Sequence, residues 1–469
     1  MTNYTLHEKP RNWKDAVGYT LQFVFAVLTA TILISTICGT SIAAGLVAAG
    51  IGTLVFLCIT GFKAPIVISN SGATVSAVVG ALALTSSVAT NFAGVIIGGA
   101  VIAVVYSLAA LAIKKWGVTW LQRLIPPLVA GTTILVIGIT LAAFIPTYAL
   151  VGGAYSLWGI LVAGVTALTT ILCMNYGKGL VKTMPFLIGL LVGYALSFIL
   201  TVTGVAPLVA IGVLSSVNSI FMVPQFAFLS TNFAAFNWAT LPQIVMSFGM
   251  VSLAALAEHV GDMTTASAVT GYNLIEEPGL HRTLLGDGLG SLVGTIIGGQ
   301  PNTTYSEYTS TMAISGVFST HFTLYTALVL IALGFIAPFN AFLMALPNAV
   351  FAGVSIVAYG MIALAGLRTI VADFTRTKNQ TIFAAMITTG VSGLAITAGA
   401  FNLTGIALSL VVGIILNFIL RDEKSKKISR WPEPNITAGE YLDKRVNTIN
   451  EQAVSSPAYE TKNYKLDLK

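Results

Sequence analysis

Long apolar runs fill most of this sequence, and charge is almost absent from them. Between Ala16 and Ala257 there is not one Asp or Glu. Of the 469 residues, 56% are hydrophobic and only 9% are charged, whereas soluble domains carry about 25% charged residues. Such a chain cannot cover a surface that faces water. The composition therefore excludes a soluble enzyme and indicates a protein that crosses a membrane many times.

We predict fourteen membrane spans, because each span needs about twenty apolar residues to cross roughly 30 Å of hydrocarbon. They lie near residues 17–38, 42–61, 66–88, 92–113, 124–146, 155–175, 184–203, 243–268, 283–299, 302–318, 322–343, 348–366, 381–398 and 401–420. Two of them, 66–88 and 302–318, are poor candidates for continuous helices. The first contains Ser69-Asn70-Ser71-Gly72, and the second opens with Asn302-Thr303-Thr304-Tyr305.

The basic residues orient these spans. With the N-terminus inside, every break that contains Lys or Arg falls on the cytoplasmic side, and no Lys or Arg falls in an outside loop, including segment 204–242. The positive-inside rule therefore predicts that residues 1–16 and the polar tail 421–469 are both cytoplasmic. The formal net charge of +6 forms no basic stripe with interleaved aromatic residues, so nucleic acid is not an expected partner.

The two interrupted spans occupy corresponding places if the chain consists of two halves of seven spans. Each is then the third span of its half, and the odd number makes the halves inverted relative to each other. Interrupted helices in such positions point to the central site of a transporter, since irregular backbone at membrane depth occurs only where it is buried or lines a cavity. Two helices merely softened by Gly and Ser are the alternative.

Four acidic residues fall inside apolar runs: Glu258, Asp262, Asp287 and Glu307. An ionised carboxylate at mid-bilayer costs at least ~2.5–3.5 kcal/mol, so an intramembrane acid marks a functional site by default. Glu258 and Asp262 share one helix face about 6 Å apart, where joint ionisation is disfavoured. Such a pair can carry a proton, or donate a hydrogen bond to a polar substrate while neutral. For Asp287 a structural role is an equal alternative, and His259 is interpreted as a packing or orienting residue.

Motifs for other chemistries are absent from the sequence. It has no phosphate-binding loop, zinc-protease motif or nucleophile elbow. Its four His are scattered, and its three Cys lack CxxC spacing. We therefore expect no cofactor, no metal site and no enzymatic activity, and we expect transport driven by an ion gradient.

A family resemblance emerges from the second half of the chain. Ala257-Glu258-His259-Val260-Gly261-Asp262 is followed by Pro278-Gly279-Leu280-His281-Arg282, by Gly286-Asp287-Gly288, and by Pro301-Asn302-Thr303-Thr304-Tyr305-Ser306-Glu307. Ile125-Pro126-Pro127-Leu128-Val129-Ala130-Gly131 adds support in the first half. This series closely resembles the nucleobase–ascorbate transporter family, in particular its bacterial uracil permeases. The resemblance extends from about Trp13 to Ile419.

The resemblance implies an all-α polytopic fold with two inverted repeats of seven spans each. A core domain would comprise spans 1–4 and 8–11, at residues 17–113 and 243–343. A gate domain would comprise spans 5–7 and 12–14, at residues 114–203 and 344–420, with 204–242 as an extracellular loop. The third and tenth spans would each combine a short strand with a half-helix.

The resemblance also implies the site. In such transporters the glutamates at the positions of Glu258 and Glu307 hydrogen-bond the nucleobase. Backbone amides around Ser306 and Tyr308, and around Gly72 and Ala73, complete the substrate-binding pocket. Asp262 is implicated in proton coupling, together with Glu258 and Asp287.

Several residues depart from the uracil-permease pattern. Tyr308 and Ser310 replace the usual Asn and Gly, and Ser315 and Gly316 replace the motif's closing Thr and basic residue. Gly72 stands where an aromatic residue is common, Asp262 where His is common, and Asp287 is typical of purine-type members.

The function implied is import of a nucleobase across the plasma membrane by proton symport, with uracil as the leading substrate. A xanthine or other purine permease is the alternative, as is an anion exchanger of the same architecture, although four intramembrane acids argue against bound anions. Coupling to Na⁺ instead of H⁺ stays open. Family members are often dimers through the gate domain, so a homodimer is compatible with the resemblance.

Overall fold

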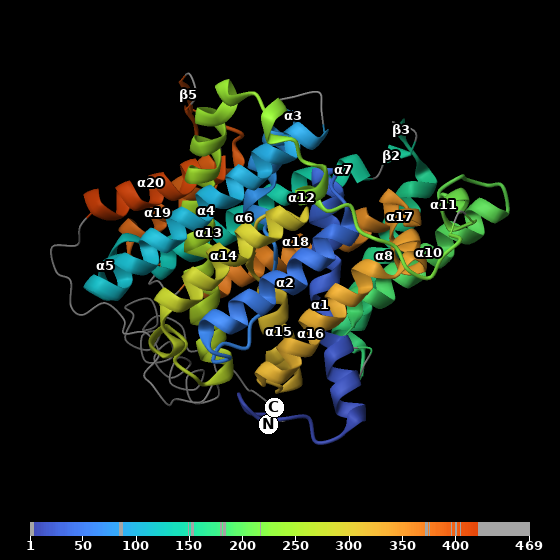
Figure 1. Cartoon of the computed structure of the whole chain (residues 1–469), viewed down its shortest axis with the longest axis horizontal. Coiled ribbons are helices and arrows are strands. Elements are labelled where there is room, and N and C mark those ends of the chain that lie inside the picture. The colour runs from blue at the N-terminus through green and yellow to red at the C-terminus, as the bar shows by residue number, and fades with distance from the viewer. Residues whose placement is uncertain are drawn as a thin grey trace, which may run out of the picture.

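The computed structural model describes residues 4–420, apart from 84–87, 149, 152–153, 179–180, 182–183, 216, 371–373, 375, 395, 399–400 and 404. Asp373 and the polar tail therefore lie outside the described residues. The described chain is mostly helical (Figure 1). Among these residues, eight helices are long and apolar enough to cross a bilayer, and three shorter helices are also apolar.

The first half of the chain contains the following elements: α1 (Trp13–Cys38), α2 (Ile42–Thr60), β1 (Ile68–Asn70), η1 (Gly72–Thr74), α3 (Val75–Ala83), α4 (Val88–Trp116), α5 (Thr119–Leu124), α6 (Pro127–Leu141), η2 (Ala142–Phe144), α7 (Ile145–Tyr148), β2 (Leu150–Val151), β3 (Ala154–Tyr155), α8 (Leu157–Tyr176) and α10 (Pro185–Val202).

The second half contains α11 (Ile211–Ser215), α12 (Ala227–Ser230), η3 (Phe233–Ala235), η4 (Trp238–Thr240), α13 (Leu241–Thr270), η5 (Ile275–Gly279), α14 (Leu280–Ile297), β4 (Asn302–Thr304), α15 (Ser306–Ser315), α16 (Thr320–Phe335), α17 (Ala337–Ala345), α18 (Asn348–Thr369), α19 (Thr377–Val391), β5 (Ile396–Ala398), β6 (Phe401–Leu403) and α20 (Gly405–Ile419).

Local sequence signals set the ends of the first two helices. Asn12 caps α1 by accepting a hydrogen bond from the backbone N–H of Asp15, and Ser41 caps α2 in the same way through Ala44. Both helices end at a glycine, Gly39 with φ 66° and Gly61 with φ 62°. Capping side chains satisfy the free N–H groups of a first turn, and a left-handed glycine closes the last turn.

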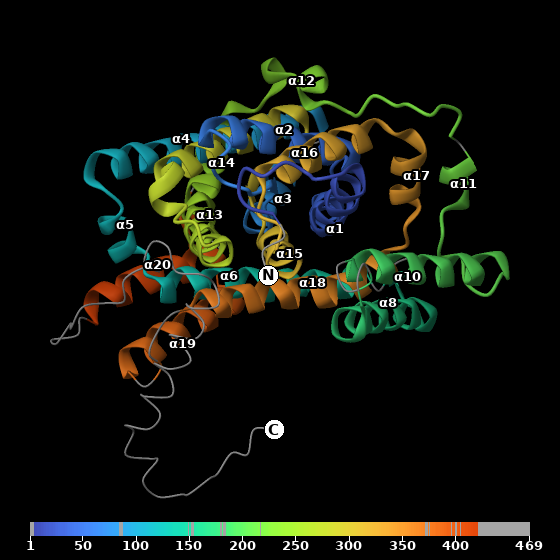
Figure 2. The ribbon, with the colours of Figure 1, turned by 90° about the horizontal axis from the view of Figure 1, so that it is seen from below.

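The helices pack as two groups, which Figure 2 shows one above the other. The first helix group consists of α1, α2, α4, α13, α14 and α16, and the second of α6, α8, α10, α18, α19 and α20. The groups touch where α13 packs on α6 and α20, and where α15 packs on α18. The second interrupted segment thus lies at the boundary between the two groups.

A short antiparallel sheet joins the two interrupted segments. Strand β1 pairs with β4, with Ile68 opposite Thr304 and Asn70 opposite Asn302. The Asn70 amide donates to the Thr31 carbonyl of α1 at 3.2 Å, and the Asn302 amide donates to the Gly290 carbonyl of α14 at 3.1 Å. The two asparagines therefore fix the strand pair to the surrounding helices, and each strand then leads into a helix that faces the group boundary.

Two predicted spans have the wrong bounds. The span at 322–343 is two helices, α16 and α17, because Ile336 is extended and the backbone N–H of Ala337 donates to Ile220 at 2.9 Å. Pro338 then lies in the first turn of the new helix, where its missing N–H is tolerated. The span at 381–398 stops as a helix at Val391, and residues 396–398 pair with 401–403 as a β-hairpin.

Candidate functional site

Helix α15 brings Glu307 to the boundary between the helix groups. Tyr305 is still extended after β4, with φ −109° and ψ 111°, and the helix begins at the next residue. The Tyr305 hydroxyl donates to the Asn70 carbonyl at 2.9 Å and so ties this junction to β1. Glu307 lies in the first turn of α15, where the helix dipole favours a negative group.

Asp262 connects α13 to the start of α15. Its Oδ1 accepts a hydrogen bond from the Ser306 hydroxyl at 2.5 Å, and its Oδ2 accepts one from the Thr304 hydroxyl at 2.7 Å. Asp262 itself is only 3% exposed. A carboxylate that accepts on both oxygens is well satisfied, and charge-assisted bonds of this length are strong. The Asp262 carboxylate therefore connects α13 to the junction between β4 and α15.

Glu258 and Glu307 differ from Asp262 in having free acceptor atoms. Among the described residues, Oε2 of Glu258 and Oε1 of Glu307 are buried and have no hydrogen-bond partner. Asp262, Asp287 and Glu307 all lie near enough to Glu258 to act on it electrostatically. Buried polar atoms normally have partners, so an unpaired one calls for an explanation such as an absent ligand or water. Two such carboxyl groups near one another are suited to binding a polar ligand through hydrogen bonds.

His259 and Asp287 form a separate buried pair. Nδ1 of His259 lies 2.8 Å from Oδ2 of Asp287, and Nε2 lies 3.0 Å from the Thr283 hydroxyl. Both side chains of the pair are 0% exposed. The Thr283 hydroxyl also lies 3.1 Å from the Leu280 carbonyl, to which it can donate. His259 thereby orients α14 against α13, which makes it the orienting residue that its helix position predicts.

Gly72 and Ala73 lie at the start of η1, which packs on α13 and α6. A Cβ on Gly72 would lie 3.0 Å from Cδ1 of Leu141 and 3.6 Å from Cγ2 of Ile137. Two side chains of α6 thus occupy the room into which a larger residue at position 72 would grow.

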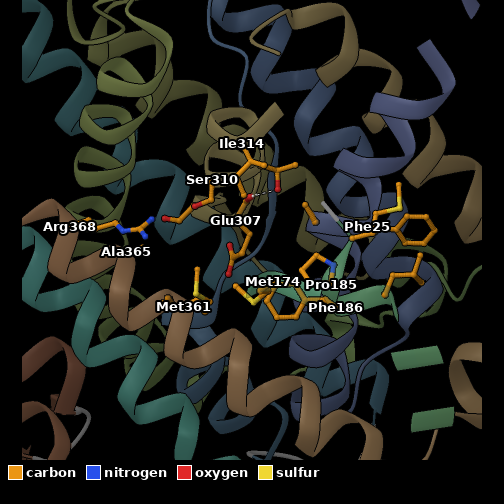
Figure 3. A pocket seen from close by; sticks show the side chains of 16 residues that line it. Phe25, Met174, Pro185, Phe186, Glu307, Ser310, Ile314, Met361, Ala365 and Arg368 are labelled. Atoms are coloured by element: carbon orange, nitrogen blue, oxygen red, sulfur yellow. Dashed lines mark hydrogen bonds between the residues drawn. The ribbon is translucent and has the colours of Figure 1, made fainter. Parts of the chain in front are cut away.

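A pocket opens between the helix groups beside Glu307 (Figure 3). Helix α15 contributes Ser306, Glu307, Ser310, Thr311 and Ile314, and α18 contributes Met361, Ile362, Ala365 and Arg368 on the facing side. The remaining lining residues come from α1, α8 and the start of α10: Phe25, Ala26, Met174, Met184, Pro185, Phe186 and Leu187. The pocket is therefore an apolar cleft with one carboxyl group at its centre.

The structure gathers part of the predicted site at this pocket. Ser306 and Glu307 line it, and Asp262 touches it through Ser306. The Tyr308 side chain points away, since its hydroxyl lies 2.9 Å from the Thr323 hydroxyl of α16. Asp287 is paired with His259 instead of lining the pocket.

Sequence reasoning missed two kinds of residue. Ser306 is predicted to contribute only a backbone amide and Thr304 has no predicted role, whereas the hydroxyls of both residues are the partners of Asp262. Arg368, in the last turn of α18, has no role in the predicted site, although it lines the pocket. Arg368 is far from the acidic residues in the sequence, and no motif connects it to them, so the sequence does not predict this placement.

These features define the class of protein to which the chain belongs. The described residues form a multi-pass membrane protein in which two broken segments and buried acids meet at the boundary of two helix groups. Solved transporters share this fold: the transmembrane domain of the cyanobacterial bicarbonate transporter BicA superposes with a TM-score of 0.63 at 16% identity, covering 88% of this chain and 100% of that one. The structure titled as the overall structure of SLC26A9 superposes with a TM-score of 0.62 at 11% identity, over 86% and 64% of the two chains.

The sequence comparisons give the family. A model described as "Permease family" matches residues 14–399. The uracil permease of Bacillus caldolyticus is 34% identical over 410 residues, which is 86% of this chain and 91% of that protein. The uracil permease of Bacillus subtilis is 33% identical over 89% and 94% of the two chains, and that of Escherichia coli is 31% identical over 87% and 91%. The chain belongs to this permease family, and it is a transporter rather than an enzyme.

Proposed function

We propose that this chain imports a nucleobase, with uracil as the leading substrate, by proton symport across the plasma membrane. The observation that carries the proposal is the pair of buried, unpartnered carboxyl oxygens of Glu258 and Glu307. Of the two, Glu307 lines the cleft between the helix groups, and Glu258 does not. Relatives at 31–34% identity over most of the chain are uracil permeases. The alternative of a purine permease draws no support from them.

A neutral, planar base suits this cleft. Its N–H and C=O edges need partners when the ring leaves water, and unpaired carboxyl oxygens can accept from the N–H edge. We propose that Glu258 and Glu307 accept hydrogen bonds from the N–H groups of the base. Backbone amides near Ser306 and Tyr308, and near Gly72 and Ala73, would donate to its carbonyl groups. The Met and Phe side chains of the cleft cover the ring faces.

Proton coupling would use the carboxyl cluster. Glu258 and Asp262 lie on one face of α13, and both carboxyls are buried. Protonation of one of them removes a charge that the membrane interior opposes, and a proton on Asp262 would replace one of its two accepted hydrogen bonds. That change would loosen α15 from α13. Asp287 stays a further coupling candidate, because its Oδ1 has no partner among the described residues.

The transport movement is proposed as rocking of one helix group against the other. We assign the core domain to residues 17–113 and 243–343 and the gate domain to 114–203 and 344–420, as two inverted repeats of seven spans. Strand β1 and strand β4, paired in register, are the feature that supports this symmetry. Both termini are proposed to be cytoplasmic, following the placement of Lys and Arg.

Uptake of radiolabelled uracil by cells that lack their own base permeases tests the proposal. Wild type should accumulate uracil more strongly when the outside is acidified, and Glu258→Gln should abolish accumulation. Glu277→Gln is the matched control, since Glu277 is 73% exposed and pairs with Lys63 at the surface. Undiminished proton-dependent uptake by Glu258→Gln refutes the site. Excess unlabelled xanthine, guanine and adenine in parallel assays separate a uracil permease from a purine permease, and Na⁺ replacement identifies the coupling ion.

A further inference from the structure

The chain's first described residues form a built part of the transporter. Residues 4–8, which we name the N-terminal strap, lie beside residues 316–320 in the connection between α15 and α16. Tyr4 forms a parallel bridge with Val317. The backbone N–H of Phe318 donates to the Tyr4 carbonyl at 2.9 Å, and that of Thr320 donates to the Leu6 carbonyl at 2.9 Å. The Ser319 hydroxyl donates to the Glu8 carbonyl at 2.6 Å.

The strap buries every second residue against the protein. Tyr4 is 2% exposed and Leu6 is 8% exposed, whereas Thr5 and His7 are exposed. The chain turns directly after Tyr4, since the backbone N–H of Glu8 donates to the Thr5 carbonyl at 3.2 Å. A polar N-terminal segment with no role of its own would have no reason to bury its tyrosine.

Tyr4 is held on every side. Its hydroxyl donates to Oδ2 of Asp15 at 2.5 Å and accepts from the backbone N–H of Arg11 at 3.1 Å. The Arg11 guanidinium lies over its ring, 4.8 Å from the centroid. On the inner side the ring meets Phe322 edge-on, with centroids 5.1 Å apart. These contacts place the tyrosine as a fixed wedge between α1 and α16.

An aromatic cluster links this wedge to α15. The ring centroids of Phe322 and Phe23 of α1 are 6.4 Å apart, and those of Phe23 and Tyr308 of α15 are 4.7 Å apart. The Tyr308 hydroxyl returns to Thr323 of α16 at 2.9 Å. Tyr308 follows Glu307 directly in the chain. The residue at which this sequence departs from the usual Asn of uracil permeases is thus the residue that the cluster holds.

We propose that the N-terminal strap, with Tyr4 as its anchor, is a positioning element for α15, and that it works with Tyr308 to fix Glu307 at the binding pocket. The strap grips α15 at both ends: through Gly316, whose carbonyl accepts from the Tyr4 N–H at 3.2 Å, and through the aromatic cluster at Tyr308. A short helix of ten residues has little stability of its own. Contacts from outside the helix are therefore needed to restrict the position of its first turn, which contains Glu307.

The inference rests on the proposed role of Glu307 in binding, so its test includes a readout that does not depend on transport. Full-length variants Tyr4→Ala, Leu6→Ala and Tyr4→Phe are compared with His7→Ala, which changes an exposed strap residue. Hydrogen exchange of residues 306–315 is followed by mass spectrometry on the protein in nanodiscs. We expect faster exchange there for Tyr4→Ala and Leu6→Ala, with α18 unchanged, and wild-type exchange for His7→Ala. Tyr4→Phe keeps the ring and should lie between the two.

Uptake kinetics give the functional arm. Loss of one aromatic contact of this kind changes an equilibrium constant about three- to tenfold, here the constant for correct placement of α15. The KM for uracil should therefore rise about three- to tenfold in Tyr4→Ala at equal membrane abundance. Tyr4→Ala and Tyr308→Phe should combine less than additively, because they act through one cluster. Should Tyr4→Ala fail to insert, Leu6→Ala and Tyr4→Phe carry the comparison.

The outcomes separate the two proposals. Wild-type exchange at residues 306–315 and an unchanged KM in folded strap variants would overturn the positioning role. Uniformly faster exchange across α15 and α18 would also overturn it, since that result describes general destabilisation. A wild-type protein that fails to take up uracil would refute the proposed function, while the exchange experiment would still decide the role of the strap.

Discussion

Ser306 donates a hydrogen bond of 2.5 Å to Oδ1 of Asp262. This contact joins the first residue of α15 to the middle of α13, and the Thr304 hydroxyl makes a matching bond to the other carboxylate oxygen at 2.7 Å. Of the four acids inside apolar runs, Asp262 is therefore the one whose two carboxyl oxygens both have hydrogen-bond partners. Its charge is stabilised by the two residues that flank the strand-to-helix junction.

Asp262→Asn is expected to uncouple transport from the proton gradient. Asparagine offers only one acceptor oxygen, so it can serve either Ser306 or Thr304, and it cannot take up a proton. In proteoliposomes with an imposed pH gradient, accumulation of uracil should be lost. Exchange of labelled for unlabelled uracil across the same vesicles should persist, because Glu258 and Glu307 remain. Accumulation at the wild-type level would show that the travelling proton does not reside on Asp262.

Glu307→Gln is expected to weaken substrate binding rather than to abolish insertion. A hydrogen bond to a charged group is worth about 1.5–3 kcal/mol, which corresponds to a rise in KM of about ten- to 150-fold. Equilibrium binding of radiolabelled uracil to the purified protein measures the effect without relying on turnover. Glu277→Gln, on an exposed glutamate whose pKa is lowered by its hydrogen bond from Lys63, should bind as wild type does. Equal affinity for both variants would place the substrate elsewhere.

His259→Ala is expected to destabilise the protein more than Asp287→Asn. The alanine variant leaves the buried Asp287 side chain without its hydrogen-bond partner, which costs about 1–3 kcal/mol for a polar group and more for a charged one. Asparagine at position 287 still offers an oxygen to Nδ1 of His259. Thermal melting of the detergent-solubilised variants, followed by size-exclusion chromatography, checks the order. A reversed order would mean that the contact between His259 and Asp287 does not hold α13 to α14.

The sequence predicted the membrane character and the region of the site, because both depend on local features. A run of apolar residues or an acid inside it is visible without knowing any tertiary contact. The two broken segments were equally visible, since Asn70 and Asn302 stand in runs too polar for a buried helix. The pairing of these asparagines in one register is a tertiary fact, and the composition alone could not supply it.

Other features could not be read from local sequence. The break at Ile336 depends on backbone bonds to residues 220–222, which belong to a distant loop. The wedge formed by Tyr4 depends on Phe322, more than three hundred residues away in the chain. Tyr308 stood out as a departure from a family pattern, and only its contact with Thr323 shows where the side chain goes. Contacts between residues so far apart in sequence leave no periodic trace.

Gly52→Ala is expected to prevent correct assembly around β4. An added Cβ would lie 2.2 Å from Nδ2 of Asn302, the amide that holds β4 to the carbonyls of Ala48 and Gly290. Asn302 would have to give up both bonds, and overpacking in a close-packed interior costs about 1–3 kcal/mol before those losses. Gly360→Ala is the matched control, because no atom of the described residues lies within 4 Å of its added Cβ and alanine favours the helix. Membrane abundance and melting temperature should fall for the first variant and stay level for the second. Retained stability in Gly52→Ala would show that the Asn302 amide can be displaced, and that the other bonds of the strand pair are sufficient to hold it in place.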